Sequence, residues 1–149
     1  MKDKKVKATK KNKESVKPAS ANKSDKPTIE YIYFTSGEIA QERHVVNNKT
    51  SILIDFYLNG NKKHESYYVD GIRHREDRPA YISYWNSGSV CVEKYIYNGM
   101  HHRLDGPAII YYYQNKYEIK KCLYYINDRL IECNSDEEFK KIVKLMMFK

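Results

Sequence analysis

The sequence has few of the residues that build disulfide-bonded, metal-binding or membrane-spanning proteins. Only three cysteines occur among 149 residues, and none forms a CxxC pair. An odd number leaves one thiol over in any disulfide scheme, and metal-ligand spacing is absent, which indicates a reducing, intracellular compartment. No run approaches the roughly 18 apolar residues needed to span a bilayer. The N-terminus has lysines but no apolar stretch behind them, so a secretory signal is not predicted.

Positive charge is concentrated at the N-terminus. Residues 1–27 contain ten lysines and three acidic residues, a net of +7 out of the formal +8. This segment has no aromatic side chain and too little apolar surface to offset its conformational entropy, so we expect a disordered tail. Its candidate nucleic-acid contacts are Lys4, Lys5, Lys7, Lys10, Lys11 and Lys13. A nuclear import signal around the lysine cluster and a purely solubilising extension remain alternatives.

A repeat of 28 residues organises the rest of the chain. Residues 102–108 read HRLDGPA, and residues 74–80 read HREDRPA. A turn dipeptide, Asn98-Gly99 or Asp70-Gly71, precedes each copy, and a run rich in tyrosine and isoleucine follows it. A fixed period of this length is typical of repeat architectures.

Between the loops, short β-rich runs alternate with turn signals, which predicts an antiparallel meander. Four hairpins are expected. The first has strands over residues 31–34 and 39–46, and the second runs from about residue 52 to a turn at 59–60 and returns to residue 69. The third has strands over 81–85 and 90–97, and the fourth over 109–113 and 119–126. Tight turns should lie on one side of the sheet and the HRxDxPA loops on the other. Glu42, Glu65 and Glu93 fall in one column.

The C-terminus predicts a helix. Ser135 and Glu138 form a capping box, and apolar residues follow at helical spacing from Phe139. The fold class is therefore mainly β: an antiparallel meander of repeated hairpins in a single twisted sheet, with a C-terminal α-helix and a disordered N-terminal tail. The expected divisions are a tail over 1–27, the hairpin repeats over 28–133, and a helix over 134–149 that packs on one sheet face.

The repeated loop motif is interpreted as structural. Histidine, arginine and aspartate together are compatible with acid–base catalysis, but neither copy contains a nucleophilic serine or cysteine. Catalysis needs one site, whereas this motif recurs with the fold. The predicted structural residues are His74, Arg75, Asp77, Pro79, His102, Arg103, Asp105, Gly106 and Pro107. A binding edge that also includes His101 remains an alternative, and no catalytic, cofactor-binding or metal-binding residue is predicted.

Fifteen tyrosines are compatible with a stacking platform for single-stranded nucleic acid. Tyrosine also pairs well across β-strands, and this second interpretation is favoured because the aromatic residues follow the repeat. Tyr57, Trp85 and Tyr113 are the candidate interface residues. A homo-oligomer or a protein partner is expected, with face packing favoured over edge pairing because sheet twist limits extension.

Residues 52–128 resemble a MORN-like repeat family, in the variant that reads roughly NGxxHRxDGPAxxxYxxxGxxxxExYYxNG. That variant occurs in uncharacterised proteins of mimivirus-type giant viruses and in some bacteria and phages. Arg78 replaces the family glycine in the first copy, and Lys116-Tyr117 replaces the turn glycine in the second. The resemblance implies a twisted antiparallel sheet used for binding or scaffolding, with no catalytic residues to carry over.

The sequence thus predicts a non-enzymatic repeat module for protein interaction or structural assembly, without a cofactor. The loop variant and the lysine- and tyrosine-rich composition suggest a viral protein, located in host cytoplasm or the virion. The alternative is a nucleic-acid-binding accessory protein that uses the basic arm and an aromatic sheet face.

Overall fold

The computed structural model describes residues 26–114 and 118–148. These residues form thirteen strands and one helix. The strands are β1 (Thr28–Tyr33), β2 (Ile39–Val45), β3 (Thr50–Phe56), β4 (Lys62–Val69), β5 (Ile72–Arg73), β6 (Tyr81–Tyr84), β7 (Val90–Lys94), β8 (Ile96–Tyr97), β9 (Met100–His101), β10 (Ile109–Tyr112), β11 (Ile119–Leu123), β12 (Tyr125–Ile126) and β13 (Arg129–Leu130). The helix is α1 (Asp136–Met147).

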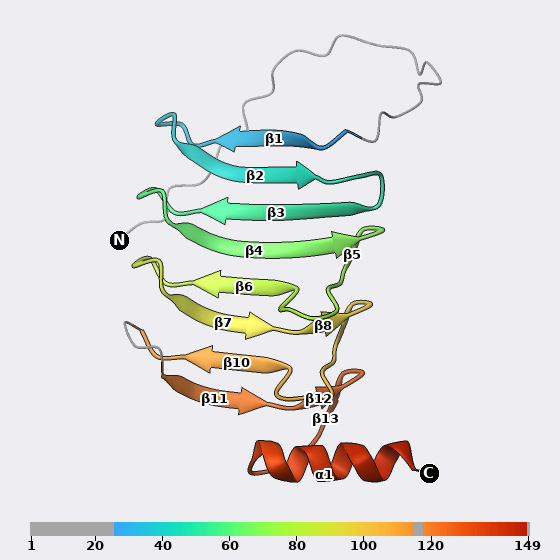
Figure 1. Cartoon of the computed structure of the whole chain (residues 1–149). Helices are drawn as coiled ribbons and strands as arrows, with labels where there is room; N and C mark the ends of the chain where they lie inside the picture. The colour runs from blue at the N-terminus through green and yellow to red at the C-terminus, as the bar shows by residue number, and fades with distance from the viewer. Residues whose placement is uncertain (1–25, 115–117, 149) are drawn as a thin grey trace.

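Most strands belong to one antiparallel sheet that follows chain order. Its nine strands run β1-β2-β3-β4-β6-β7-β10-β11, with β5 paired to β4. Figure 1 shows the hairpin turns along one side of this ladder and the longer loops along the other. The prediction of a mainly β meander of hairpins with a C-terminal helix is confirmed. The predicted tail lies outside the described residues except for Lys26 and Pro27.

The four hairpins whose turns lie on one side of the sheet, β1–β2, β3–β4, β6–β7 and β10–β11, carry the same irregularity. The register shifts by one residue between Ile32 and Tyr33, Asp55 and Phe56, Ser83 and Tyr84, and Tyr111 and Tyr112. Where the turns are described, a glycine follows with positive φ, such as 89° at Gly88, a conformation that costs glycine little. The repeated sequence therefore produces repeated backbone geometry, with corresponding residues in corresponding positions.

Two return strands are shorter than expected. Residues 90–97 and 119–126 were predicted as single strands, but each is interrupted, at Tyr95 and Tyr124. The backbone of Tyr95 is engaged by the next loop: its N–H donates to Ala108 O at 2.7 Å, and its carbonyl accepts from His102 N–H at 3.1 Å. The residues after the break form separate two-stranded ladders, β8–β9 and β12–β13. Tyr67 makes the same two bonds to its loop, yet β4 stays continuous, because β3 pairs with it as far as Val69. β6 and β10 begin only after the HRxDxPA loops, so they pair with β7 and β11 no further than Lys94 and Leu123. The late start of the preceding strand, which strand periodicity does not report, causes the interruption.

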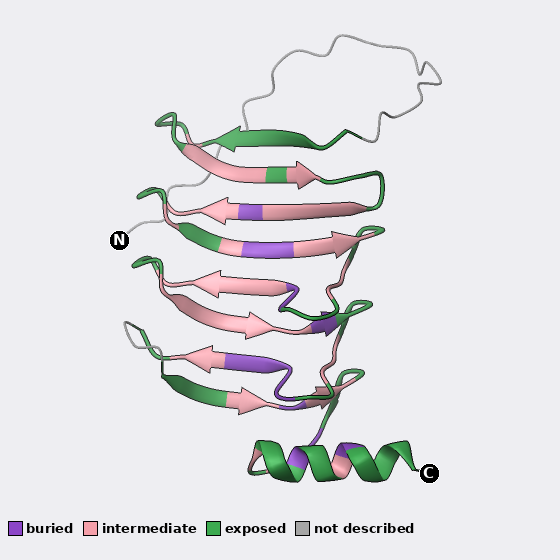
Figure 2. Ribbon diagram, viewed as in Figure 1, coloured by how far each residue is buried: buried purple, intermediate pink, exposed green. Residues whose placement is uncertain are grey.

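Burial is uneven along the array. Figure 2 shows buried segments in the middle and later strands, whereas β1 is exposed throughout. The cluster around α1 contains Tyr124, Ile131, Phe139 and Val143. Figure 1 places α1 beyond β11, at the end of the ladder. The helix therefore covers the last unit, and the faces of the earlier strands lie outside its reach, although we expected it to cover a sheet face.

The start of α1 follows its sequence signal. Ser135 Oγ accepts from Glu138 N–H at 3.2 Å, and Glu138 Oε2 accepts from Asn134 N–H at 2.8 Å. Ser135 therefore caps the helix as in a capping box, whereas Glu138 bonds to the N–H of the residue before the cap and not to that of Ser135 itself. At twelve residues, α1 is too short to cross a bilayer, and the described part of the chain holds no helix that could.

Candidate functional site in the repeated loops

Each arginine of the loop motif lies flat on a tyrosine of the strand that precedes it. The Arg75 Cζ atom is 3.8 Å from the Tyr67 ring centroid, and the Arg103 Cζ atom is 3.9 Å from that of Tyr95. Both guanidinium groups also donate from Nη1, at 3.4 Å in each case, to the carbonyl of the motif proline. Cation–π contact and hydrogen bonding thus hold each loop against its own strand.

The motif histidines connect each unit to the next. His74 Nδ1 lies 2.8 Å from Asn98 Oδ1 and 3.1 Å from the backbone N of Asn98, and His102 Nδ1 lies 3.3 Å from the backbone N of Asn127. The side chain of each histidine thus contacts the turn of the following unit. The neighbouring backbone supports the same link, because Arg75 N–H donates to Ile96 O at 3.1 Å. The loop side chains are therefore used for contacts between units.

The two copies differ in their carboxylates. Asp105 Oδ1 accepts from Arg103 Nε at 2.7 Å, and this bond lowers the pKa of Asp105. Among the described residues, neither Glu76 nor Asp77 of the first copy has a hydrogen-bond or ion-pair partner. The Asp105 side chain is 79% exposed, so water screens its pair with Arg103 and weakens the contribution to stability.

Arg78, which stands where the second copy has Gly106, leaves the loop intact. Gly106 does not adopt a positive φ, so an L-residue fits the same backbone. A Cβ at Gly106 would lie 3.3 Å from Arg103 Cζ. The glycine therefore gives room to the arginine, and the first copy still forms the equivalent bond from Arg75 to Pro79 O.

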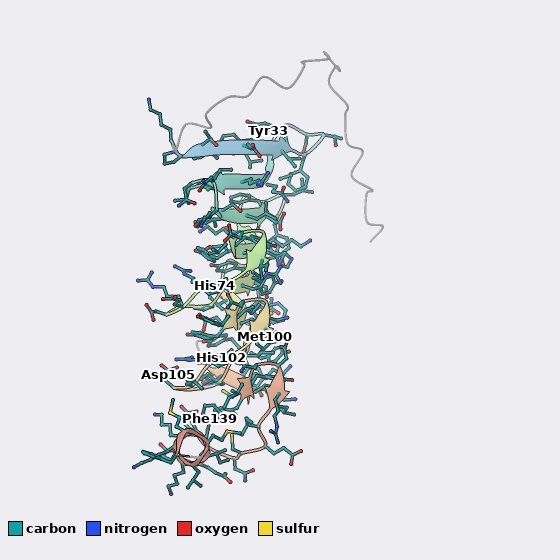
Figure 3. All side chains as sticks on the ribbon, turned by 90° about the vertical axis from the view of Figure 1, so that its right-hand side faces the viewer. Tyr33, His74, Met100, His102, Asp105 and Phe139 are labelled. Atoms are coloured by element: carbon teal, nitrogen blue, oxygen red, sulfur yellow. The ribbon has the colours of Figure 1, made fainter. Side chains whose placement is uncertain are left out.

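An open groove of about 460 Å³ separates the two loops. It is lined by Glu76, Asp77, Tyr95, Tyr97, His102, Arg103, Leu104 and Asp105. Figure 3 shows the Asp105 loop projecting from the side of the sheet on which α1 lies. The lining contains no serine or cysteine, and in the described ranges no group of three or more His, Cys, Asp or Glu side chains could hold a metal ion.

The column of glutamates holds the most buried carboxylate. Glu65 is 6% exposed and accepts from Tyr84 Oη at 2.7 Å, Lys62 Nζ at 2.7 Å and Tyr67 Oη at 3.1 Å. Burial raises its pKa, but the bonds from Lys62 and the tyrosines outweigh that effect, so the pKa lies below the usual range. Glu93 accepts from Tyr112 Oη at 2.9 Å. This network was not predicted, although Tyr84 and Tyr112 each follow their glutamate by nineteen residues.

The candidate interface residues occupy one position in successive hairpins, but their environments differ. Tyr57 is partly buried and donates to Tyr84 O at 2.9 Å. Trp85 is also partly buried, and its Nε1 has no hydrogen-bond partner among the described residues. Tyr113 is 47% exposed. Lys63 and Lys120 lie over the rings of Tyr57 and Tyr113, each at 5.8 Å.

The six candidate lysine contacts, Lys4 to Lys13, lie outside the described residues. The loop residues and the glutamate column together form internal supports of a ladder, with an open groove between two loops. Compared with family models, curated proteins and solved structures, the chain matches nothing.

Proposed function

We propose that this chain is a non-enzymatic β-repeat module for protein interaction or structural assembly. The observation that carries the proposal is how the motif is used: its arginines lie on tyrosines of their own unit, and its histidines contact the turn of the next unit. Side chains committed to such contacts build a scaffold rather than a reaction centre. The resemblance to MORN-like repeats points the same way.

The surface supports a binding role. The sheet has a single layer, and large apolar side chains remain exposed on it, including Leu58 at 66% and Ile72 at 52%. Exposed apolar surface on a folded protein often marks an interaction site. A ladder that lengthens by repetition also provides an extended surface without a deep pocket.

Photo-cross-linking of the full chain tests the proposal. A photoreactive phenylalanine at Leu58, on the turn side, or at Tyr113 should give covalent adducts with polypeptide in the cells that naturally produce the protein. The matched control carries the same group at Tyr57, the residue directly before Leu58, whose side chain is partly buried. Adducts confined to nucleic acid, or equal low yields at all three positions, would contradict a protein-interaction role.

Nucleic-acid binding is a second candidate, favoured by the charge distribution. Residues 1–27 carry +7 of the formal +8, and lysines that neutralise phosphates release counterions, which makes affinity fall steeply with salt. DNA and RNA titrations over a salt series should therefore show a steeper slope for the full chain than for a variant that begins at Thr28. Equal affinity and equal slope would exclude the arm as the binding element.

A further inference from the structure

The free edge of β1 is an open surface at one end of the ladder. Among the described strands, β1 pairs with β2 alone, and all six of its residues are exposed. Ile32 and Tyr33 are each 55% exposed, and Figure 3 places Tyr33 at the end remote from α1. Proteins often guard such edges with lysine. The opposite end strand, β11, contains Lys120 and Lys121, whereas β1 contains no lysine.

The residues that face outward from β1 can be identified. Phe34 N–H donates to Glu38 O at 2.8 Å, so Phe34 faces β2. Successive residues of an antiparallel strand direct their N–H and C=O groups to opposite sides. Ile32 therefore also bonds toward β2, and Tyr31 and Tyr33 present their backbone groups to the open edge.

In the interior units, the position of Tyr31 faces a glutamate of the preceding return strand. The register shift after Ile32 matches those of the later hairpins and aligns Tyr31 with Ile54, Ile82 and Ile110. Their partners across the sheet are Glu42, Glu65 and Glu93, respectively. For the two units joined by an HRxDxPA loop, the glutamate comes seventeen residues before its partner.

Tyr33 occupies the position of the tyrosines that donate to these glutamates. Tyr84 and Tyr112 each follow the register shift directly, as Tyr33 does. Tyr84 Oη donates to Glu65 at 2.7 Å, and Tyr112 Oη donates to Glu93 at 2.9 Å. The edge of β1 therefore has both backbone groups and a hydroxyl placed to receive a strand with a glutamate opposite Tyr31.

The chain contains such a segment at the required spacing. Glu14 lies seventeen residues before Tyr31 and twenty-eight before Glu42. Its surroundings, KNKESV over residues 11–16, match KKHESY over residues 62–67 at the lysine, glutamate and serine. Between this segment and β1, residues 22–28 read NKSDKPT. This stretch matches HREDRPA at the aspartate and the proline, and both stretches have a basic residue at the second position.

We propose that the edge of β1 is a docking site for residues 11–16 of the same chain. The segment pairs antiparallel to β1, with Glu14 opposite Tyr31 and Ser15 opposite Glu30, and Glu14 accepts from Tyr33 Oη. Lys11 then has the same position relative to Glu14 as Lys62 has relative to Glu65, where Lys62 Nζ lies 2.7 Å from Glu65 Oε1. This inference does not depend on the proposed function.

A cysteine pair tests the register. Glu30 is in the position of Tyr81, which pairs with Ser66, the counterpart of Ser15. Opposite residues in antiparallel strands have Cα atoms about 4.5–5.5 Å apart, within the disulfide range. With the three native cysteines replaced by serine, Ser15→Cys/Glu30→Cys should form an intrachain disulfide at least about tenfold faster than Ser15→Cys/Tyr31→Cys, whose second thiol points to the other face.

Amide exchange in the otherwise native full chain provides a second test. The Tyr31 amide should be protected, and Val16→Pro, which removes a donor from the segment, should lower its protection about tenfold or more. The Ile32 amide, directed toward β2, should be unchanged. Equal trapping of both cysteine pairs, an unprotected Tyr31 amide in the full chain, or disulfides that form only between chains would each overturn the proposal; the last result would assign the edge to a second copy.

Discussion

The two ends of the sheet differ in what covers them. At the C-terminal end, Phe139 is fully buried against Tyr124, with ring centroids 4.8 Å apart. Tyr124 corresponds to Tyr67 and Tyr95, on which the loop arginines lie. A helix side chain thus replaces the arginine of the next loop. At the N-terminal end β1 has no such cover among the described residues. The contrast shows that a repeat contains the contacts to its neighbour, whereas an end needs a sequence of its own.

The N-terminal end also lacks part of the glutamate network. Glu65 and Glu93 each accept from a tyrosine of the following strand, but Phe56 occupies that position beside Glu42. Glu42 instead bonds to His44 Nε2 at 2.8 Å. The glutamate nearest the open end therefore lacks the tyrosine donor that Glu65 and Glu93 both have.

The largest effect is predicted for a substitution at the C-terminal end of the sheet, which α1 caps. Phe139→Ala should lower the free energy of unfolding by about 3–5 kcal/mol, because it removes a fully buried aromatic ring that packs on Tyr124. Phe148→Ala is the control, since Phe148 is 81% exposed, and should change stability by less than about 0.5 kcal/mol. Denaturant unfolding of both variants measures the difference, and equal midpoints would show that α1 does not cap the array.

The fold could be predicted from the sequence largely because it repeats. Turn dipeptides and alternating runs identified the hairpins, and Ser135 with Glu138 identified the start of the helix. The interruption at Tyr95 was not predictable, because it depends on where the preceding strand begins: β6 pairs with β7 only as far as Lys94. The contact of Phe139 with Tyr124 was not predicted either, because helical spacing shows which face of the helix is apolar but not what that face packs against.

The structural role of the loops, which the recurrence of HRxDxPA predicts, stays a prediction. The contacts of His74 with the next turn and of Arg75 with its tyrosine are observed, but the sequence did not predict these partners. The stacking partners, Tyr67 and Tyr95, each lie eight residues before their arginine, a separation that follows no general spacing rule. The difference between Asp77 and Asp105 depends on side-chain geometry, which the nearly identical motifs do not encode.

The second prediction compares glutamates from the interior and the open end. Glu65→Ala should lower the free energy of unfolding by about 1–3 kcal/mol, because it leaves two tyrosine hydroxyls and Lys62 without their acceptor. Glu42→Ala should cost about 1 kcal/mol or less, since Glu42 has one partner and its side chain is 20% exposed. Thermal or denaturant unfolding at pH 7 measures both variants, and similar losses would remove the distinction between the units.

Acid titration sharpens this comparison, and the sign follows from the pKa of Glu65. Since folding lowers that pKa, the stabilisation is present above the unfolded carboxyl value of about 4.3 and is lost as pH falls through the folded value. Wild type should therefore lose stability below about pH 4.3 more steeply than Glu65→Ala. Parallel curves would mean that Glu65 titrates alike in both states.

The smallest predicted effect adds the missing donor to the open end. Phe56→Tyr places a hydroxyl where Tyr84 has one beside Glu65 and Tyr112 has one beside Glu93. Because Phe56 and Tyr84 both follow the register shift directly, the new hydroxyl should reach Glu42 and raise the free energy of unfolding by about 0.5–1.5 kcal/mol, the net value of one hydrogen bond. Tyr84→Phe is the matched control and should lose at least as much, because it leaves Glu65 buried with one donor fewer. If Phe56→Tyr instead left stability unchanged while Tyr84→Phe lowered it, the first unit would differ from the others in backbone geometry as well as in sequence.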